Sequence, residues 1–294
     1  MSFSATDAAF EGFRVVRRAP LSLVFWMLVY LIGGGIMLAM AAPQLASLMA
    51  LSAGMEGNTE PSFDEVIQVF NAFGAMMALL LPAGLILGAV LSAAVTRAVL
   101  RPEAKAWGYV RFGMDELRVL AVQIILGLAI AVLMAAVYAV LAGVGAAAVA
   151  MDQPWMFLII VLGGLAGFGL VIWLAVRWSL AVPITVAEKR IAPFASFRLT
   201  KGRFWPLLGM ALLACVMTLV VSLLIQIVTF PATLIFGSME NLAAFDGQDL
   251  TAILTQAWPM IVAYSVINAI SSALQLAVLY APFTAAYQAL KGPA

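Results

Sequence analysis

The sequence predicts an all-α polytopic membrane protein, in which six transmembrane helices form three hairpins and a short cytoplasmic interfacial amphipathic helix precedes each hairpin. Two observations carry this prediction, the composition and the distribution of charge. Of the 294 residues, 65% are hydrophobic and 10% are charged, whereas a soluble domain is about half apolar and about a quarter charged. The apolar residues also form runs of about 20 or more, the length that crosses a hydrocarbon layer about 30 Å thick.

Six apolar runs are expected to be the membrane spans. Each is predicted to be a helix, because lipid requires every backbone polar group to bond within its own segment and the runs lack the alternation of barrel strands. The runs are Leu21–Ala42, Ile67–Val95, Leu117–Val149, Trp155–Val176, Phe204–Phe236 and Trp258–Leu279. We expect the first run to stay as an anchor, since it is long for a signal peptide and follows an acid-containing amphipathic segment.

The charges are segregated by this six-span arrangement. One side holds all 15 basic residues: Arg14, Arg17, Arg18, Arg97, Arg101, Lys105, Arg111, Arg118, Arg177, Lys189, Arg190, Arg198, Lys201, Arg203 and Lys291. The other side holds only acids: Glu56, Glu60, Asp64, Glu65, Asp152, Glu240, Asp246 and Asp249. Because Lys and Arg near membrane ends are retained in the cytoplasm during insertion, both termini are predicted to be cytoplasmic in a multi-pass protein of the bacterial plasma (inner) membrane.

The chain is predicted to be a single membrane domain over residues 1–294, divisible into tandem units 1–100, 101–186 and 187–294. The units align where an aromatic residue lies four positions before an arginine, as in Phe10 and Arg14, Trp107 and Arg111, and Phe194 and Arg198. On a helix this spacing places the ring at the interface and the guanidinium at the headgroups. Internal duplication and a shared positive-inside pattern both explain the alignment.

The sequence indicates no catalytic chemistry. It contains no histidine, the usual general base near neutral pH and the commonest metal ligand. Glu60, Asp64 and Glu65 fit helix caps or solvated loops better than a cation site. The single Cys215 is expected to be a small buried side chain. We therefore predict that the chain is not an enzyme, holds no cofactor or metal, and binds no nucleic acid.

Polar residues recur along the last two spans. Thr218, Ser222 and Gln226 lie on the fifth span, and Ser265, Asn268, Ser272 and Gln275 lie on the sixth. Because the two spans are antiparallel, these two polar stripes are expected to face each other. One interpretation is interhelical hydrogen bonding, worth about 0.6 kcal/mol per contact in lipid. The other is the polar wall of a cleft for a lipid headgroup or a small solute.

Small residues and prolines give further expectations about helix packing. Gly84 and Gly88 in the second span, and Gly163 and Gly167 in the fourth, form GxxxG arrangements that permit close helix contact. Prolines at 82, 231 and 282 are expected to kink or end their helices.

A basic cluster near the fifth span is a candidate lipid-headgroup patch. It consists of Arg198, Lys201, Arg203 and Trp205. Basic residues beside a membrane attract anionic lipid by about 1 kcal/mol each, so anionic headgroups on the cytoplasmic side are the predicted partners. Topology alone also explains this cluster.

One stretch resembles a known bacterial family. The segments Trp178–Pro183 (WSLAVP), Glu188 and Ala195–Trp205 (ASFRLTKGRFW) look like the six-helix membrane domain attached to some glycerophosphodiester phosphodiesterases, and like its free-standing inner-membrane relatives of unknown function. In the phosphodiesterases that carry this membrane domain, a separate soluble barrel domain catalyses the reaction, and it uses histidines and metal-binding acids. The resemblance therefore implies a plasma-membrane module linked to phospholipid handling, without the phosphodiesterase activity.

Two functions are predicted from these patterns. The first is a non-catalytic inner-membrane module, a scaffold or accessory protein of an envelope or lipid-related complex, with membrane lipids and another membrane protein as partners. The alternative is a transporter or exchanger of a lipid or other amphiphile, acting through a cleft lined by the fifth and sixth spans. A stoichiometric partner favours the first, and a continuous cavity that reaches both leaflets favours the second.

Overall fold

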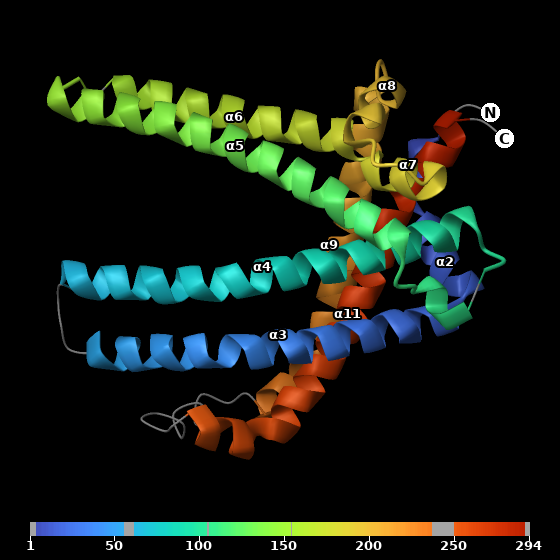
Figure 1. The fold of residues 1–294 in the computed structure, drawn as a ribbon, viewed down its shortest axis with the longest axis horizontal. Coiled ribbons are helices and arrows are strands. Elements are labelled where there is room, and N and C mark those ends of the chain that lie inside the picture. The colour runs from blue at the N-terminus through green and yellow to red at the C-terminus, as the bar shows by residue number, and fades with distance from the viewer. Residues whose placement is uncertain (1–3, 56–61, 105, 154, 237–249, 292–294) are drawn as a thin grey trace.

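The computed structural model describes residues 4–55, 62–104, 106–153, 155–236 and 250–291. These ranges contain six long helices and no strand, and all six are long and apolar enough to cross a membrane. The helices are α3 (Pro20–Met55), α4 (Phe63–Leu100), α5 (Met114–Ala150), α6 (Met156–Trp178), α9 (Phe204–Phe236) and α11 (Leu250–Lys291) (Figure 1). The predicted class, an all-α polytopic membrane protein, is confirmed.

Short elements lie together at one end of the long helices, beside both chain termini (Figure 1). They are α1 (Ala5–Ala9), α2 (Glu11–Arg18), η1 (Ala106–Tyr109), α7 (Ala181–Glu188), η2 (Pro193–Ala195) and α8 (Ser196–Leu199). We call this end the basic end, because every basic residue in the described ranges lies there. Lys105 lies outside the described residues.

The opposite ends of the three hairpins are their tips. Asp64 and Glu65 lie in the first turn of α4, and Asp152 lies two residues after the end of α5. Glu65 and Ser62 form a capping box, in which each side chain accepts a hydrogen bond from the other residue's backbone N–H. The helix-cap interpretation of Glu65 is thus confirmed. The remaining acids of this side (Glu56, Glu60, Glu240, Asp246 and Asp249) lie outside the described residues.

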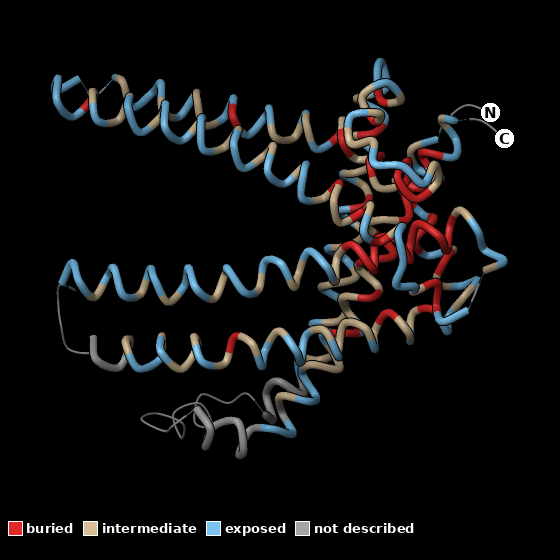
Figure 2. Tube along the Cα trace, in the orientation of Figure 1, coloured by how far each residue is buried: buried red, intermediate tan, exposed pale blue. Residues whose placement is uncertain are grey.

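Helix α11 is the centre of the packing, and it contacts α1, α2, α3, α4, α7 and α9. Ala273, Ala277 and Ala281 recur every four residues along it, and each is 0% exposed. This face of small side chains allows neighbouring helices to approach closely. On α4, residues 89–99 are all buried against these neighbours. Figure 2 shows that buried residues gather at the basic end.

The tip halves of the hairpins remain uncovered. No residue between Val122 and Ala148 of α5 is buried, and the most hydrophobic windows of the third and fourth spans contain no buried residue. The tip half of the α5–α6 hairpin extends away from the rest of the bundle (Figure 2). Since exposed apolar surface on this scale needs a non-aqueous environment, these halves must contact lipid or other membrane helices.

The GxxxG pair of α6 brings that helix close to α5. The Cβ position of Gly163 lies 2.7 Å from Leu141 Cδ2, and that of Gly167 lies 3.0 Å from Val137 Cγ1. The pair in α4 is less crowded. The Cβ position of Gly84 lies 3.9 Å from Met37 Cε, and that of Gly88 lies 3.9 Å from Gln123 Oε1. The prolines do not end their helices, because α4, α9 and α11 run continuously through residues 82, 231 and 282.

The predicted interfacial helices are corrected in one respect. The segment before the second hairpin is the 3₁₀ turn η1 and not an amphipathic helix, because Trp107 and Gly108 have positive φ angles of 55° and 62°. The segment before the first hairpin, α1–α2, is helical, as predicted. Helix α2 packs against α11 through Gly12 and Val15, both of which are buried.

Replacing Gly12 by alanine is expected to destabilise the protein by about 1 to 3 kcal/mol, the usual cost of overpacking. The new Cβ would lie 2.5 Å from Val278 Cα and 2.6 Å from Ala277 O, both backbone atoms of α11. A lower melting temperature in detergent would show this. The control is Gly209→Ala, whose Cβ meets nothing within 4 Å and should hold or raise that temperature. Equal melting temperatures would contradict the predicted close contact.

Candidate functional site at the basic end

A buried ion pair connects the first hairpin to the second at the basic end. Arg97 near the end of α4 pairs with Glu116 in the first turn of α5, and their side chains are only 4% and 7% exposed. Arg97 also donates to the backbone carbonyl of Tyr109. Glu116 accepts from the backbone N–H of Gly113, at 3.0 Å, which caps the start of α5.

The turn between α4 and α5 has an unusual backbone that these contacts hold. Trp107, Gly108 and Tyr109 all have positive φ angles, between 55° and 63°, a region that costs residues other than glycine about 1–2 kcal/mol each. Trp26 of α3, 0% exposed, donates its indole N–H to the Gly108 carbonyl at 2.8 Å. Glycine is required at 108, because a Cβ there would lie 2.6 Å from Phe25 Cβ.

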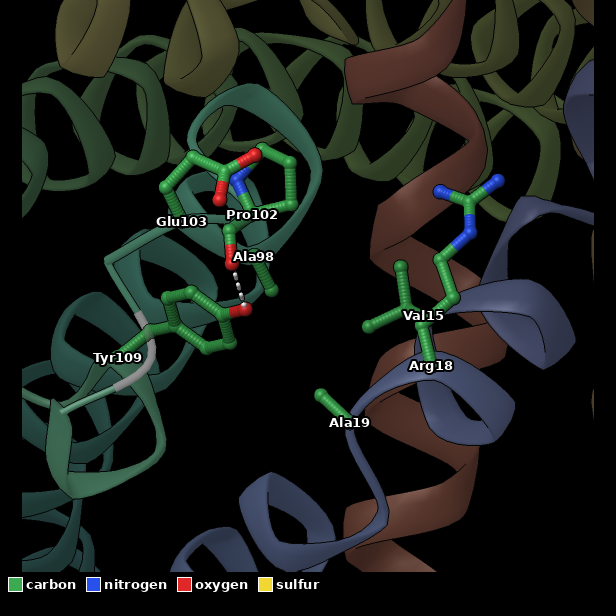
Figure 3. Close-up of a pocket in the computed structure, with 7 residues that line it drawn as sticks. All are labelled: Val15, Arg18, Ala19, Ala98, Pro102, Glu103 and Tyr109. Atoms are coloured by element: carbon green, nitrogen blue, oxygen red, sulfur yellow. Dashed lines mark hydrogen bonds between the residues drawn. The ribbon is translucent and has the colours of Figure 1, made fainter.

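A small cavity of about 250 Å³ lies between α2 and this turn. Val15, Ala19 and Ala98 form its apolar wall, and Arg18 and Glu103 supply its charged side chains. Figure 3 shows Arg18 and Glu103 on opposite sides of the cavity. The Tyr109 hydroxyl, also part of the lining, donates to the Pro102 carbonyl at 2.9 Å.

The charged groups beside this cavity form a chain of ion pairs along α1 and α2. Glu11 accepts from Arg14 Nη1 at 3.1 Å and from Arg18 Nη1 at 3.0 Å. Arg14 also pairs with Asp7, and its guanidinium holds the pKa of that carboxyl below its usual value. Within the described residues, Glu103 forms no ion pair. Among the described residues its carboxylate therefore has no cationic partner.

The stretch that resembles the known family builds the junction from α6 to α9. Ser196 donates its hydroxyl to the Arg177 carbonyl at 2.5 Å and accepts from the Leu180 N–H at 3.3 Å. The Arg177 guanidinium lies 5.4 Å from the ring centroid of Trp173 and 5.9 Å from that of Phe197. These contacts tie the segment 193–199 to the end of α6 and to the backbone that leads into α7 (Ala181–Glu188). The stretch therefore has a visible structural role at this junction.

The predicted lipid-headgroup patch is fully on the surface. Its members lie in α8, before α9 and in the first turn of α9, and all are exposed: Arg198, Lys201, Arg203 and Trp205, the last of them 77% exposed. The ring of Phe204 packs edge-on against that of Trp205, with centroids 5.4 Å apart. The structure thus leaves all four side chains exposed. Their lipid contact stays a prediction.

The two polar stripes are not joined by hydrogen bonds. Thr218 donates to the Ala214 carbonyl of its own helix, Ser272 to Asn268, and Gln275 to Ser271. Ser222 and Ser265 are half-buried, while Gln226 and Asn268 are exposed. In the described part of the chain, no hydrogen bond connects a stripe residue of α9 with one of α11. The stripes therefore provide no interhelical hydrogen bonding in this structure.

Sequence reasoning missed two features and misplaced one. The charge pattern alone assigns Arg97 to topology, although a charge within the last turn of an apolar helix, followed by an acid in the first turn of the next, points to an ion pair. The cavity had no sequence signal, because its lining comes from three separate segments. Cys215 is exposed on α9, and the expectation that it is buried is wrong.

Comparison with protein-family models, curated proteins and solved structures finds no match for this chain. The resemblance to the membrane domain of glycerophosphodiester phosphodiesterases stays a prediction. Within the described ranges, no three His, Cys, Asp or Glu residues lie close enough to hold a metal ion.

Replacing Glu116 by glutamine is expected to destabilise the protein by about 3 to 5 kcal/mol, because it leaves the buried Arg97 without a counter-charge. Thermal unfolding in detergent measures this effect. The matched control is Asp115→Asn at the neighbouring position, whose ion pair with Arg118 is about a quarter exposed and should be worth about 1 kcal/mol or less. Similar melting temperatures for the two variants would show that the buried pair does not join the hairpins.

Proposed function

We propose that this chain is a non-catalytic inner-membrane module that acts as a scaffold or accessory protein of an envelope or lipid-related complex. The observation that carries the proposal is the exposed polar surface within the spans of α9 and α11. Asn268 is exposed, and among the described residues its side chain bonds only with Ser272 of its own helix. Gln226 is also exposed and forms no side-chain hydrogen bond among the described residues.

An amide side chain in lipid needs a hydrogen-bonding partner, because hydrocarbon offers none. The uncovered tip halves of the hairpins supply apolar surface next to such amides, whereas the core at the basic end fixes the hairpins in place. This combination is suited to binding another membrane protein, one of whose helices would supply side chains that hydrogen-bond with the amides. The alternative, transport through a cleft between α9 and α11, is less well supported, since Gln226 and Asn268 are exposed and form no hydrogen bond between the helices.

The basic end is proposed to face the cytoplasm of a bacterial inner membrane, with both termini on that side. The support is the segregation of charge in the described residues. Every basic residue lies at this end, and the charged residues at the tips are all acids. The exposed aromatic rings of Phe112, Phe194 and Trp205 at the same end are suited to the interface.

This topology predicts the labelling of introduced cysteines in intact bacterial cells. In a background with Cys215→Ala, a membrane-impermeant maleimide should label Asp64→Cys at a hairpin tip but not Lys201→Cys at the basic end. Lys201→Cys should react only after the cells are permeabilised. The reverse pattern would show that the basic end faces the periplasm, which would contradict the proposed orientation.

The scaffold proposal predicts separate effects of Asn268→Leu on stability and on association. The melting temperature should stay unchanged, because among the described residues the amide forms no hydrogen bond with another helix. A photo-reactive residue at 268 in native membranes should form one crosslinked product with a distinct membrane protein, and one at Leu128 on α5 should not form that product. Recovery of this protein with the chain in mild detergent should fall about tenfold in Asn268→Leu, the effect of about 1.4 kcal/mol.

Thr218→Val is the matched control for association, since that hydroxyl is bonded to its own helix. A crosslinked product of twice the chain's mass would identify a second copy as the occupant and would contradict the proposal of a different protein. A large loss of stability in Asn268→Leu would show instead that the amide serves folding.

A further inference from the structure

We propose that the cavity between α2 and the α4–α5 turn binds a phosphoethanolamine group, with the phosphate at Arg18 and the ammonium at Glu103. This inference does not rest on the proposed scaffold function. It starts from the two oppositely charged residues that line the cavity on opposite sides (Figure 3). A ligand that satisfies both must carry an anion and a cation a few atoms apart.

Arg18 has donors available for an anion. Its side chain is 59% exposed, and its single ion pair within the described residues uses Nη1 toward Glu11. Glu11 is shared with Arg14, so it neutralises Arg18 only in part. A guanidinium has five N–H donors in a fixed planar arrangement that suits two oxygens of a phosphate. The remaining donors of Arg18 can therefore hold a phosphodiester at the mouth of the cavity.

Glu103 completes the site on the opposite wall. It is exposed and forms no ion pair among the described residues, so an ammonium group there would gain a charge-assisted hydrogen bond without displacing another partner. The Tyr109 hydroxyl donates to Pro102 and retains lone pairs that can accept a second ammonium N–H. A ligand with only a phosphate would leave this carboxylate facing an anion.

The volume of the cavity and its position at the ends of the membrane spans both favour a lipid headgroup as the ligand. Its volume of about 250 Å³ is below the usual range for drug-sized ligands, roughly 300–1,000 Å³, and suits a small polar group. Ala19 directly precedes α3, and Ala98 lies in the last turn of α4, so the cavity lies where the spans leave the hydrocarbon. The acyl chains of a bound lipid would then extend along the exposed helices.

Native mass spectrometry of the full chain in detergent tests this assignment with three added probes: dioleoyl phosphatidylethanolamine, dioleoyl phosphatidylglycerol and soluble phosphoethanolamine. The wild type should bind phosphatidylethanolamine preferentially. Arg18→Gln should weaken the binding of both lipids about tenfold, the loss expected for a charged hydrogen bond. Glu103→Gln should weaken only phosphatidylethanolamine by a similar factor, because phosphatidylglycerol has no ammonium.

Arg17→Gln is the matched control, since Arg17 is exposed on the same helix but does not line the cavity; it should bind both lipids as the wild type does. If soluble phosphoethanolamine binds as tightly as the lipid, the cavity is still a phosphoethanolamine site, but its ligand is a free metabolite and not a lipid. If Arg18→Gln fails to fold, Glu103→Gln carries the test, because that side chain has no partner to lose among the described residues. An unchanged lipid preference in Glu103→Gln would overturn the proposal.

Discussion

The buried pair of Arg97 and Glu116 is the interaction on which the arrangement of the first two hairpins depends. Two charges removed from water cost several kcal/mol each, and their attraction offsets this only when other hydrogen bonds complete the geometry. Here the Tyr109 carbonyl and the Gly113 N–H supply such bonds. The pair therefore adds little net stability over an apolar replacement, but it allows only one register between α4 and α5.

That register also explains the strained turn that connects the two helices. Trp107 and Tyr109 adopt positive φ angles, which a free loop would avoid because of clashes with the side chain. The turn is held by Trp26 from α3 and by Arg97 from α4. Strain of this kind persists only where surrounding contacts determine the backbone. The same contacts place Tyr109 against the cavity, so the joint between the hairpins and the candidate ligand site form one unit.

The sequence was sufficient to predict the membrane-spanning helices. It was insufficient to predict the turns and contacts that connect one hairpin to the next. Apolar runs reveal membrane helices because lipid leaves the backbone no other choice, and the predicted third run, Leu117–Val149, lies within α5. The turn at Trp107 depends on contacts with distant segments, which no local pattern contains. Likewise, the stripe spacing on α9 and α11 gives the period of a helix but not its rotation, so it could not show that Asn268 is exposed.

The concentration of buried residues at one end follows from the different solvents along the molecule. Within the hydrocarbon, apolar side chains lose nothing by facing lipid, so the tip halves gain little from packing against one another. At the headgroup level water returns, and burial of apolar side chains such as Val15 of α2 is again favourable. A compact core at the basic end with separate hairpins beyond it is the expected result. It leaves the hairpins available to lipid or to other helices while their bases stay fixed.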